Sequence, residues 1–307
     1  GEAAAAFGDH ATNRQSLYQG LALPGEHGGQ TMAADLELAR SASDGAVPFG
    51  DHDFRRAAGR LQLRGGQSQT DFFAGVQQKF FGWPNLYTPF GFNETEDLRT
   101  TLYTFNHRAW TSPENFWQFG AYYRRNDDDY EFNRAVPGAS NPFIHTTQVR
   151  ALALDGHQVF GDYAVTYGVQ AMRDHLESTA LTFGRFRTRD YYKASVVPER
   201  EFATASGRLQ LRAGATYDDT NRDAAALSPI LEAVLTRPDG TRFYAQYSET
   251  TQVATYTALN SSPVAGLFRG NPNLGRATSR NLEAGISFQP AGWKVEAAVF
   301  HRWDDRL

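Results

Sequence analysis

The sequence predicts an all-β protein, built as an antiparallel up-and-down transmembrane β-barrel. Three observations support this fold. Apolar and polar side chains alternate with period two along most of the 307 residues, the alternating runs last about ten residues, and short connections alternate with long ones. Tilted strands that cross a bilayer need about 9–11 residues. A mean hydropathy of -0.52 is compatible with such a barrel, because only alternate residues of each strand face lipid.

The alternation predicts about fifteen strands in one barrel unit that covers the whole chain, residues 1–307. We expect these strands at 1–8, 14–23, 30–42, 53–65, 68–80, 98–109, 114–125, 146–156, 162–173, 189–198, 206–217, 227–236, 241–250, 278–289 and 292–302. Short connections fall at 65–67, 111–113, 237–240 and 290–292, and long ones at 81–97, 126–145, 174–188 and 251–277. Short turns at one end and long loops at the other are typical of outer-membrane barrels.

Alternation also assigns side chains to two faces, because successive residues of a strand point to opposite sides. We expect the lipid-facing set to include Val165, Tyr167, Val169, Leu209, Leu211, Ala213, Val295 and Val299. The opposite, polar face is expected to include Gln170, Arg208, Gln210, Arg212, Lys294 and Glu296. A shift of one residue in register would reverse every one of these assignments.

Composition and motifs exclude several functional classes. The 30 basic and 34 acidic residues give no broad attraction to nucleic acid, and the absence of cysteine excludes disulfides and thiolate metal sites. No run approaches the roughly 18 apolar residues of a transmembrane helix. The chain contains no phosphate loop, no nucleophile elbow and no zinc-protease motif. We therefore predict no catalytic residue and no cofactor.

Three segments carry a family resemblance. Gly270-Asn271-Pro272-Asn273-Leu274 precedes an alternating strand that contains Ser279, Asn281, Glu283 and Gly285. Gly82-Trp83-Pro84-Asn85-Leu86-Tyr87 is followed by Asn93-Glu94-Thr95-Glu96-Asp97, and Leu211-Arg212-Ala213-Gly214-Ala215-Thr216-Tyr217-Asp218 ends a strand in Tyr-Asp. In this pattern the chain resembles the barrel of TonB-dependent outer-membrane receptors.

The resemblance implies a receptor in the outer membrane of a Gram-negative-type bacterium, in contact with outer-membrane lipid. It implies uptake of a siderophore, cobalamin or similar bulky nutrient, coupled to the TonB complex through a plug domain. Complete members carry that plug and a 22-stranded barrel. The sequence shows no plug and only about 15 of the 22 strands. Since an unpaired strand edge is costly in hydrocarbon, we expect a fragment that lacks the plug and the last strands.

Aromatic and amide side chains in the long connections are the candidate ligand-binding residues, because such side chains suit a bulky, partly apolar ligand. The candidates are Trp83, Asn85, Tyr87, Phe90, Tyr130, Phe132, Tyr256, Phe268, Asn271 and Asn273. The alternative for the same residues is that long loops pack their aromatic side chains against one another, which gives the loops small cores of their own.

Other functions stay open on the sequence alone. Asp127, Asp128, Asp129 and Glu131 are a weak calcium candidate, although their spacing does not match an EF-hand. A passive porin-like channel is an alternative to the receptor. An outer-membrane barrel enzyme is a further alternative, with Asp174, His175 and Glu177 as a grouping that imitates a site at a barrel rim.

Overall fold

The computed structural model describes residues 1–27, 29–138, 143–181, 187–261, 270–289 and 292–305. Its elements are β1 (Glu2–Phe7), β2 (Asn13–His27), β3 (Gln30–Ser43), β4 (His52–Arg64), β5 (Ser68–Pro84), β6 (Asn93–Trp110), β7 (Phe116–Glu131), β8 (Phe143–Phe160), β9 (Tyr163–Ser178), β10 (Thr188–Thr204), β11 (Gly207–Thr220), β12 (Asp223–Thr236), β13 (Arg242–Gln252), α1 (Tyr256–Asn260), β14 (Ala277–Phe288) and β15 (Val295–Asp305). No helix among the described residues is long and apolar enough to cross a membrane.

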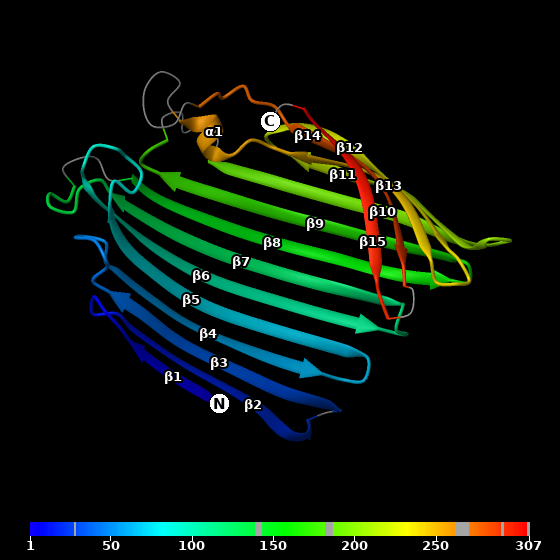
Figure 1. Cartoon of the computed structure of the whole chain (residues 1–307), viewed down its shortest axis with the longest axis horizontal. Helices are drawn as coiled ribbons and strands as arrows, with labels where there is room; N and C mark the ends of the chain where they lie inside the picture. The colour runs from blue at the N-terminus through cyan, green and yellow to red at the C-terminus, as the bar shows by residue number, and fades with distance from the viewer. Residues whose placement is uncertain (28, 139–142, 182–186, 262–269, 290–291, 306–307) are drawn as a thin grey trace. The chain divides into compact units, whose positions relative to one another are not determined.

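The strands form one antiparallel meander, which confirms the predicted fold class. The fifteen described strands follow one another in sheet order from β1 to β15, with those two strands at the ends of the order. Figure 1 shows β1 to β6 lying side by side in chain order. Each strand pairs with the next through a local hairpin, as expected for an up-and-down barrel wall. The sheet is therefore a partial barrel wall.

The chain divides into two compact units. Unit 1 comprises residues 1–109, 120–152 and 173–188, and unit 2 comprises residues 110–119, 153–172 and 189–307. Unit 1 contains β1 to β5 and β6 up to Ala109, and unit 2 contains β10 from Arg189 onward, β11 to β15 and the helix α1.

One face of unit 1 carries apolar side chains that are open to the surroundings. Cross-strand pairing places Leu17, Leu38, Ala57 and Val76 in one row across β2 to β5. Leu17, Leu38 and Val76 are 43%, 42% and 51% exposed. Rows of exposed apolar side chains suit hydrocarbon and not water. We call this side the outer face and the opposite side the inner face.

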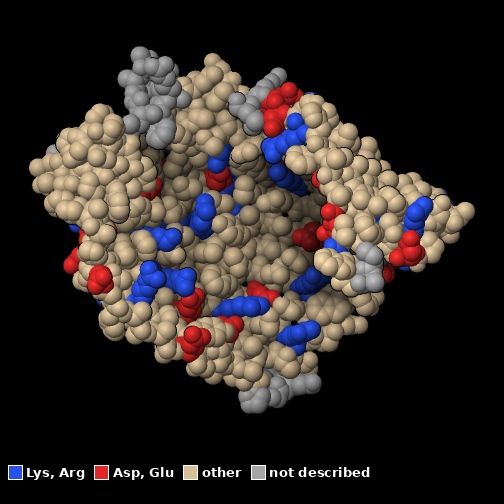
Figure 2. All heavy atoms as spheres, in the orientation of Figure 1, with Lys and Arg blue, Asp and Glu red and all other residues tan. Residues whose placement is uncertain are grey.

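The inner face of unit 1 is polar. Tyr18 donates from its hydroxyl to Asp35 at 2.6 Å, and Arg60 donates from Nε to Asp71 at 2.9 Å. In the same face Arg56 pairs with Glu37. Figure 2 shows Lys and Arg interleaved with Asp and Glu, with no large area of one sign. Paired charges of both signs are what a water-filled barrel interior tolerates.

Unit 2 has the same two-faced pattern. Leu211, Ala233, Ala245, Ala284 and Val299 form one continuous row of cross-strand partners. On the other face Arg212 contacts Glu232 at 2.9 Å and Glu199 at 3.2 Å. The registers confirm the predicted division of faces for Leu209, Leu211, Ala213, Val295 and Val299 against Arg208, Gln210, Arg212 and Glu296.

The registers do not cover the remaining residues of that prediction. Lys294 lies just before β15 and contacts Glu296 at 2.8 Å. The residues Val165, Tyr167, Val169 and Gln170 lie in β9, and their assignment to faces stays a prediction.

All fifteen predicted strands exist, but several are longer than expected at the end where the long connections lie. The connection predicted at 81–97 shrinks to residues 85–92, and the one at 126–145 shrinks to 132–142. Trp83 and Tyr130 therefore lie in strands and not in loops. The acidic run at 127–129 and Glu131 also lie in β7. The sequence pattern does not indicate these strand ends, because a strand that extends into water carries polar residues on both faces and loses its apolar alternation.

Candidate functional site

The loop 85–92, between β5 and β6 in unit 1, carries the aromatic candidates Tyr87 and Phe90, and Trp83 lies just before it at the end of β5. Trp83, Tyr87 and Phe90 are 47%, 55% and 64% exposed. Asn85 has a positive φ of 57°, a conformation that asparagine tolerates better than most residues. Its amide N–H donates to the Phe92 carbonyl at 3.0 Å, and its side-chain oxygen accepts from the Gly91 N–H at 2.5 Å. The predicted binding residue Asn85 therefore closes the loop from within.

A buried carboxylate holds this loop on the strand that follows it. The side chain of Glu94, at the start of β6, is 0% exposed. Its oxygens accept the Tyr87 N–H at 2.7 Å, the Thr88 N–H at 3.2 Å and the Thr88 hydroxyl. Hydrogen bonds to an ionised acceptor are the stronger kind, and a buried carboxylate requires them. The anchor fixes the backbone next to the exposed aromatic rings.

Tyr87 is anchored a second time through its side chain. Its hydroxyl donates to Glu96, two residues along β6 from Glu94 on the same strand face. Burial raises the pKa of the Tyr87 hydroxyl, and the neighbouring Glu96 carboxylate raises it further. The hydroxyl therefore stays protonated and available as a donor at neutral pH. One edge of the ring is fixed while much of its surface stays open.

The other aromatic candidates of unit 1, Tyr130 and Phe132, pack against neighbouring rings. The rings of Tyr87 and Tyr130 meet edge to face at 5.5 Å, and Tyr130 stacks on Phe143 at 5.7 Å. Phe132 contacts Phe90 at 6.5 Å and Phe92 at 4.4 Å between ring centroids. Tyr130 is only 6% exposed. Tyr130 thus belongs to a small core beneath the loops, whereas Phe90 lies over that core and is open.

An ion pair fastens two further connections of unit 1 together. Arg134 binds both oxygens of Asp51, the second at 3.2 Å. Its guanidinium also lies over the Phe80 ring at 5.7 Å, and the backbone N–H of Arg134 donates to the Asn93 carbonyl at 3.0 Å. The hydrogen bonds from Arg134 hold the pKa of the Asp51 carboxyl below its usual range.

In unit 2, the connection between β13 and β14 treats its candidates differently. Tyr256, in α1, is 7% exposed and lies under the Arg189 guanidinium at 4.1 Å. Asn271 donates from its N–H to the Ala258 carbonyl at 2.7 Å, and its side-chain oxygen accepts the Asn273 N–H at 3.0 Å. The Asn-Pro-Asn segment is thus a turn that docks on the helix. Phe268 lies outside the described residues.

A buried guanidinium anchors this second connection. Arg276 is 7% exposed and contacts Asp218 at 3.0 Å. It also donates to the Thr251 hydroxyl at 3.0 Å and the Ala224 carbonyl at 3.1 Å. Lys193 reaches the other oxygen of Asp218 at 3.0 Å. The buried charges are paired, which a low-dielectric site requires.

The remaining polar candidates are the acidic residues of β7 and the acid–histidine grouping of β9. Asp127 is held by Arg125 at 2.9 Å and by the Thr146 hydroxyl at 2.7 Å, and Asp128, its neighbour in β7, points to the other face. In β9, His175 Nε2 lies 3.5 Å from Glu177 Oε1, whereas Asp174 is the neighbour of His175 along the strand and so points to the opposite face. In the part of the chain that the structure describes, no three His, Asp or Glu side chains are placed to hold a metal ion.

Sequence reasoning did not identify Glu94, Glu96 or Arg276 as parts of the site. The segment Asn93–Asp97 contributes to the family resemblance but not to the candidate binding residues. A signal was present, since Glu94 and Glu96 are two apart in a strand and follow a loop rich in aromatic residues. Arg276 stands alone after the Asn-Pro-Asn turn, and its partners Asp218 and Thr251 are distant in sequence.

Comparison with known proteins places this architecture in a family. The model of the β-barrel of TonB-dependent receptor-like proteins matches residues 42–306. The chain belongs to the TonB-dependent receptor β-barrel family. Members of this family are receptors and transporters for small-molecule nutrients such as siderophores, and they interact with TonB. No curated protein sequence matches the chain.

Solved structures show the same fold. The siderophore receptor PirA from Pseudomonas aeruginosa is 17% identical with a TM-score of 0.70, over 95% of this chain and 52% of that one. The ferric yersiniabactin uptake receptor FyuA from Yersinia pestis is 15% identical with a TM-score of 0.64, over 96% and 52%. The copper transporter OprC is 13% identical with a TM-score of 0.64, over 95% and 51%. This chain spans about half the length of these receptors.

Proposed function

We propose that this chain is the barrel portion of an outer-membrane receptor that takes up a siderophore, cobalamin or similarly bulky nutrient. The outer face of both units would contact membrane lipid. Uptake by the complete receptor would be coupled to the TonB complex. Family membership supports the general role, and the likeness to the siderophore receptor PirA and the ferric yersiniabactin uptake receptor FyuA favours a ferric chelate among the possible ligands.

One observation carries the proposal for the binding surface. Trp83, Tyr87 and Phe90 expose their rings within eight residues of one another, and the fully buried Glu94 holds the loop between them. A rigid, exposed aromatic surface loses little conformational entropy when a ligand binds. The surface is therefore suited to a ligand that is bulky and partly apolar.

The experiment is a binding and uptake screen in cells that express the complete receptor. The probes are ferric enterobactin, ferric yersiniabactin, cobalamin and copper ion. We expect saturable uptake of one of the three bulky probes, lost when TonB is deleted and weakened about tenfold or more by Trp83→Ala with Phe90→Ala. Uptake of copper ion alone would contradict the proposed ligand class. Uptake that continues without TonB would identify a passive channel instead. Failure of all four probes to bind would contradict the proposed ligand class.

A further inference from the structure

A cavity of about 440 Å³ lies against the first strands of unit 1, away from the aromatic loop. Its floor is made by small side chains in three neighbouring strands, namely Ala4, Ala6, Ser16, Ala39 and Ser41. The cavity exists because these cross-strand partners all lack bulk on one face. Phe54, Arg14, Arg56 and Lys79 rise around that floor.

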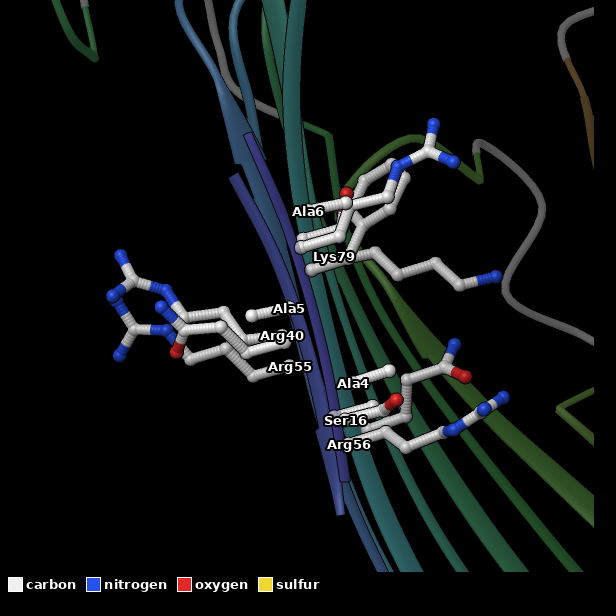
Figure 3. Close-up of a pocket in the computed structure, with 14 residues that line it drawn as sticks. Ala4, Ala5, Ala6, Ser16, Arg40, Arg55, Arg56 and Lys79 are labelled. Atoms are coloured by element: carbon white, nitrogen blue, oxygen red, sulfur yellow. The ribbon is translucent and has the colours of Figure 1, made fainter. Parts of the chain in front are cut away.

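Strand registers place these groups on the inner face. Ala6, Arg14, Ser41, Phe54 and Lys79 are successive cross-strand partners from β1 to β5. Figure 3 shows Lys79, Arg56 and Ser16 on one side of the sheet, and Arg40 and Arg55 on the other. Ten of the fourteen lining residues thus belong to the inner face, whereas Ala5, Gln15, Arg40 and Arg55 belong to the outer face.

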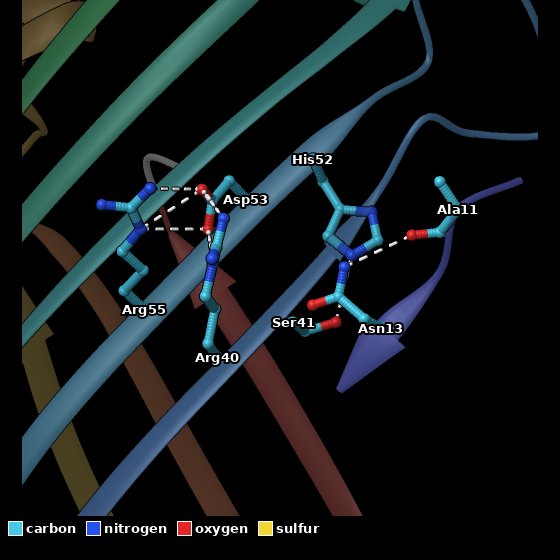
Figure 4. Close-up of polar contacts among 7 residues, drawn as sticks. All are labelled: Ala11, Asn13, Arg40, Ser41, His52, Asp53 and Arg55. Atoms are coloured by element: carbon cyan, nitrogen blue, oxygen red, sulfur yellow. Dashed lines mark hydrogen bonds and ion pairs between the residues drawn. The ribbon is translucent and has the colours of Figure 1, made fainter. Parts of the chain in front are cut away.

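The cations on the two faces differ in how they are neutralised. On the outer face, Arg40 and Arg55 both bind Asp53, with Arg40 Nη2 at 2.9 Å and Arg55 Nη2 at 2.5 Å from Oδ2 (Figure 4). On the inner face, Arg56 pairs with Glu37, but the side chains of Arg14 and Lys79 make no ion pair or hydrogen bond with any described residue. The cavity therefore has two cations without an acidic partner among the residues that the structure describes.

We propose that this cavity is a binding site for a small aromatic carboxylate, separate from the loop 85–92. Arg14 and Lys79 would hold the anionic group from two sides, since charge-assisted hydrogen bonds are the strong ones. The Phe54 ring and the alanine floor would receive the apolar ring.

The test measures binding of phthalate to the purified protein in detergent micelles by calorimetry. We expect saturable binding that weakens about tenfold with Arg14→Gln or with Lys79→Gln, since each change removes one charge-assisted contact. Ala39→Leu keeps every charge but fills the floor, and should abolish binding.

Matched controls lie on the opposite face of the same sheet. Arg99→Gln, on the outer face of β6, removes the same charge but should leave phthalate binding unchanged, as should Ala57→Leu on the outer face of β4. Two neutral or aliphatic probes test the chemistry: phthalamide should not bind, and N-acetylglutamate amide should bind more weakly because it has no ring for Phe54. Equal binding of phthalamide, or equal losses in the outer-face variants, would overturn the site.

A result in which N-acetylglutamate amide binds as tightly as phthalate would overturn the aromatic part of the proposal. It would point instead to acidic side chains of a polypeptide as the occupant. None of these substitutions touches Trp83, Tyr87 or Phe90. Failure here therefore leaves the proposed receptor function standing, and failure of the nutrient screen leaves this site standing.

Discussion

The two long connections with candidate ligand residues, at 85–92 in unit 1 and at 253–276 in unit 2, are anchored by opposite charges. A fully buried Glu94 holds the first, and a nearly buried Arg276 holds the second. The aromatic side chains that the structure describes in the two connections also differ in solvent exposure. Tyr87 and Phe90 are 55% and 64% exposed, whereas Tyr256 is 7% exposed. Aromatic composition alone does not define a binding surface. What distinguishes the first loop is that its backbone is fixed while its rings stay open.

The largest effect is expected for the anchor of unit 2. Arg276→Met leaves Asp218 buried with Lys193 as its remaining described cation, and should lower the free energy of unfolding by about 3–5 kcal/mol. Urea-induced unfolding in lipid vesicles measures the change. Arg280→Met is the matched control, because its ion pairs with Glu249 and Asp305 are exposed to solvent, so their loss should change the free energy of unfolding much less. Equal losses in the two variants would show that Arg276 is not a special anchor.

The anchor of unit 1 should act locally. Glu94→Gln keeps one acceptor oxygen but loses the charge, and should cost the loop about 2–3 kcal/mol, or about 30- to 150-fold faster exchange at the Tyr87 and Thr88 amides. Hydrogen exchange followed by mass spectrometry detects this. Glu114→Gln, at an exposed glutamate in a turn, should leave those amides unchanged. Unchanged exchange in Glu94→Gln would mean that other contacts hold the loop.

The exposed and buried aromatic residues should separate in a binding assay. Phe90→Ala should weaken the ligand found by the nutrient screen about tenfold, because it removes open apolar surface from the binding face. Tyr256→Leu should leave affinity within about twofold, since the buried ring fills a small core and does not reach a ligand. A larger affinity loss at Tyr256 than at Phe90 would reverse the assignment of the two loops.

The strands could be predicted from sequence because alternation is set by burial on one face. Leu17, Leu38 and Val76 lie in such alternating runs, next to the polar residues Ser16, Glu37 and Gln77, and the strand registers then place them in one row. The strand ends could not be predicted. Asp127 to Asp129 and Glu94 to Glu96 continue their strands with no apolar partner face, so their composition indicates a loop.

The candidate site was only half predictable, because exposure depends on contacts between residues distant in sequence. Tyr130 and Tyr256, like Tyr87, fall in connections that the sequence predicts to be long. In the structure Phe143 packs on Tyr130, and the Arg189 guanidinium lies over Tyr256. Glu94 could not be distinguished from a solvated loop carboxylate, since its role depends on the loop folding back onto β6. The Asn271 side-chain oxygen accepts the Asn273 backbone N–H within a turn, and a ligand contact of either side chain stays a prediction.

The smallest effect concerns pH. The pKa of the Asp51 carboxyl is lowered from 3.8 by the hydrogen bonds from Arg134, so the tie is fully present above that value and is lost as pH falls through the lower folded pKa. We expect protection of the Arg134 amide to be constant from pH 7 to about 5 and to fall only below about pH 4. Asp51→Asn should remove this step. A step near pH 6 would require a different titrating group.

The central claim is that ligand binds at the open rings of the loop 85–92. The sequence contains no cysteine, so single cysteines can be placed without background. Phe90→Cys and, in the other loop, Leu274→Cys give two positions that are 64% and 41% exposed for labelling by a maleimide. Saturating ligand should slow labelling about tenfold or more in Phe90→Cys and leave Leu274→Cys unchanged. Protection at Leu274→Cys with none at Phe90→Cys would contradict the account.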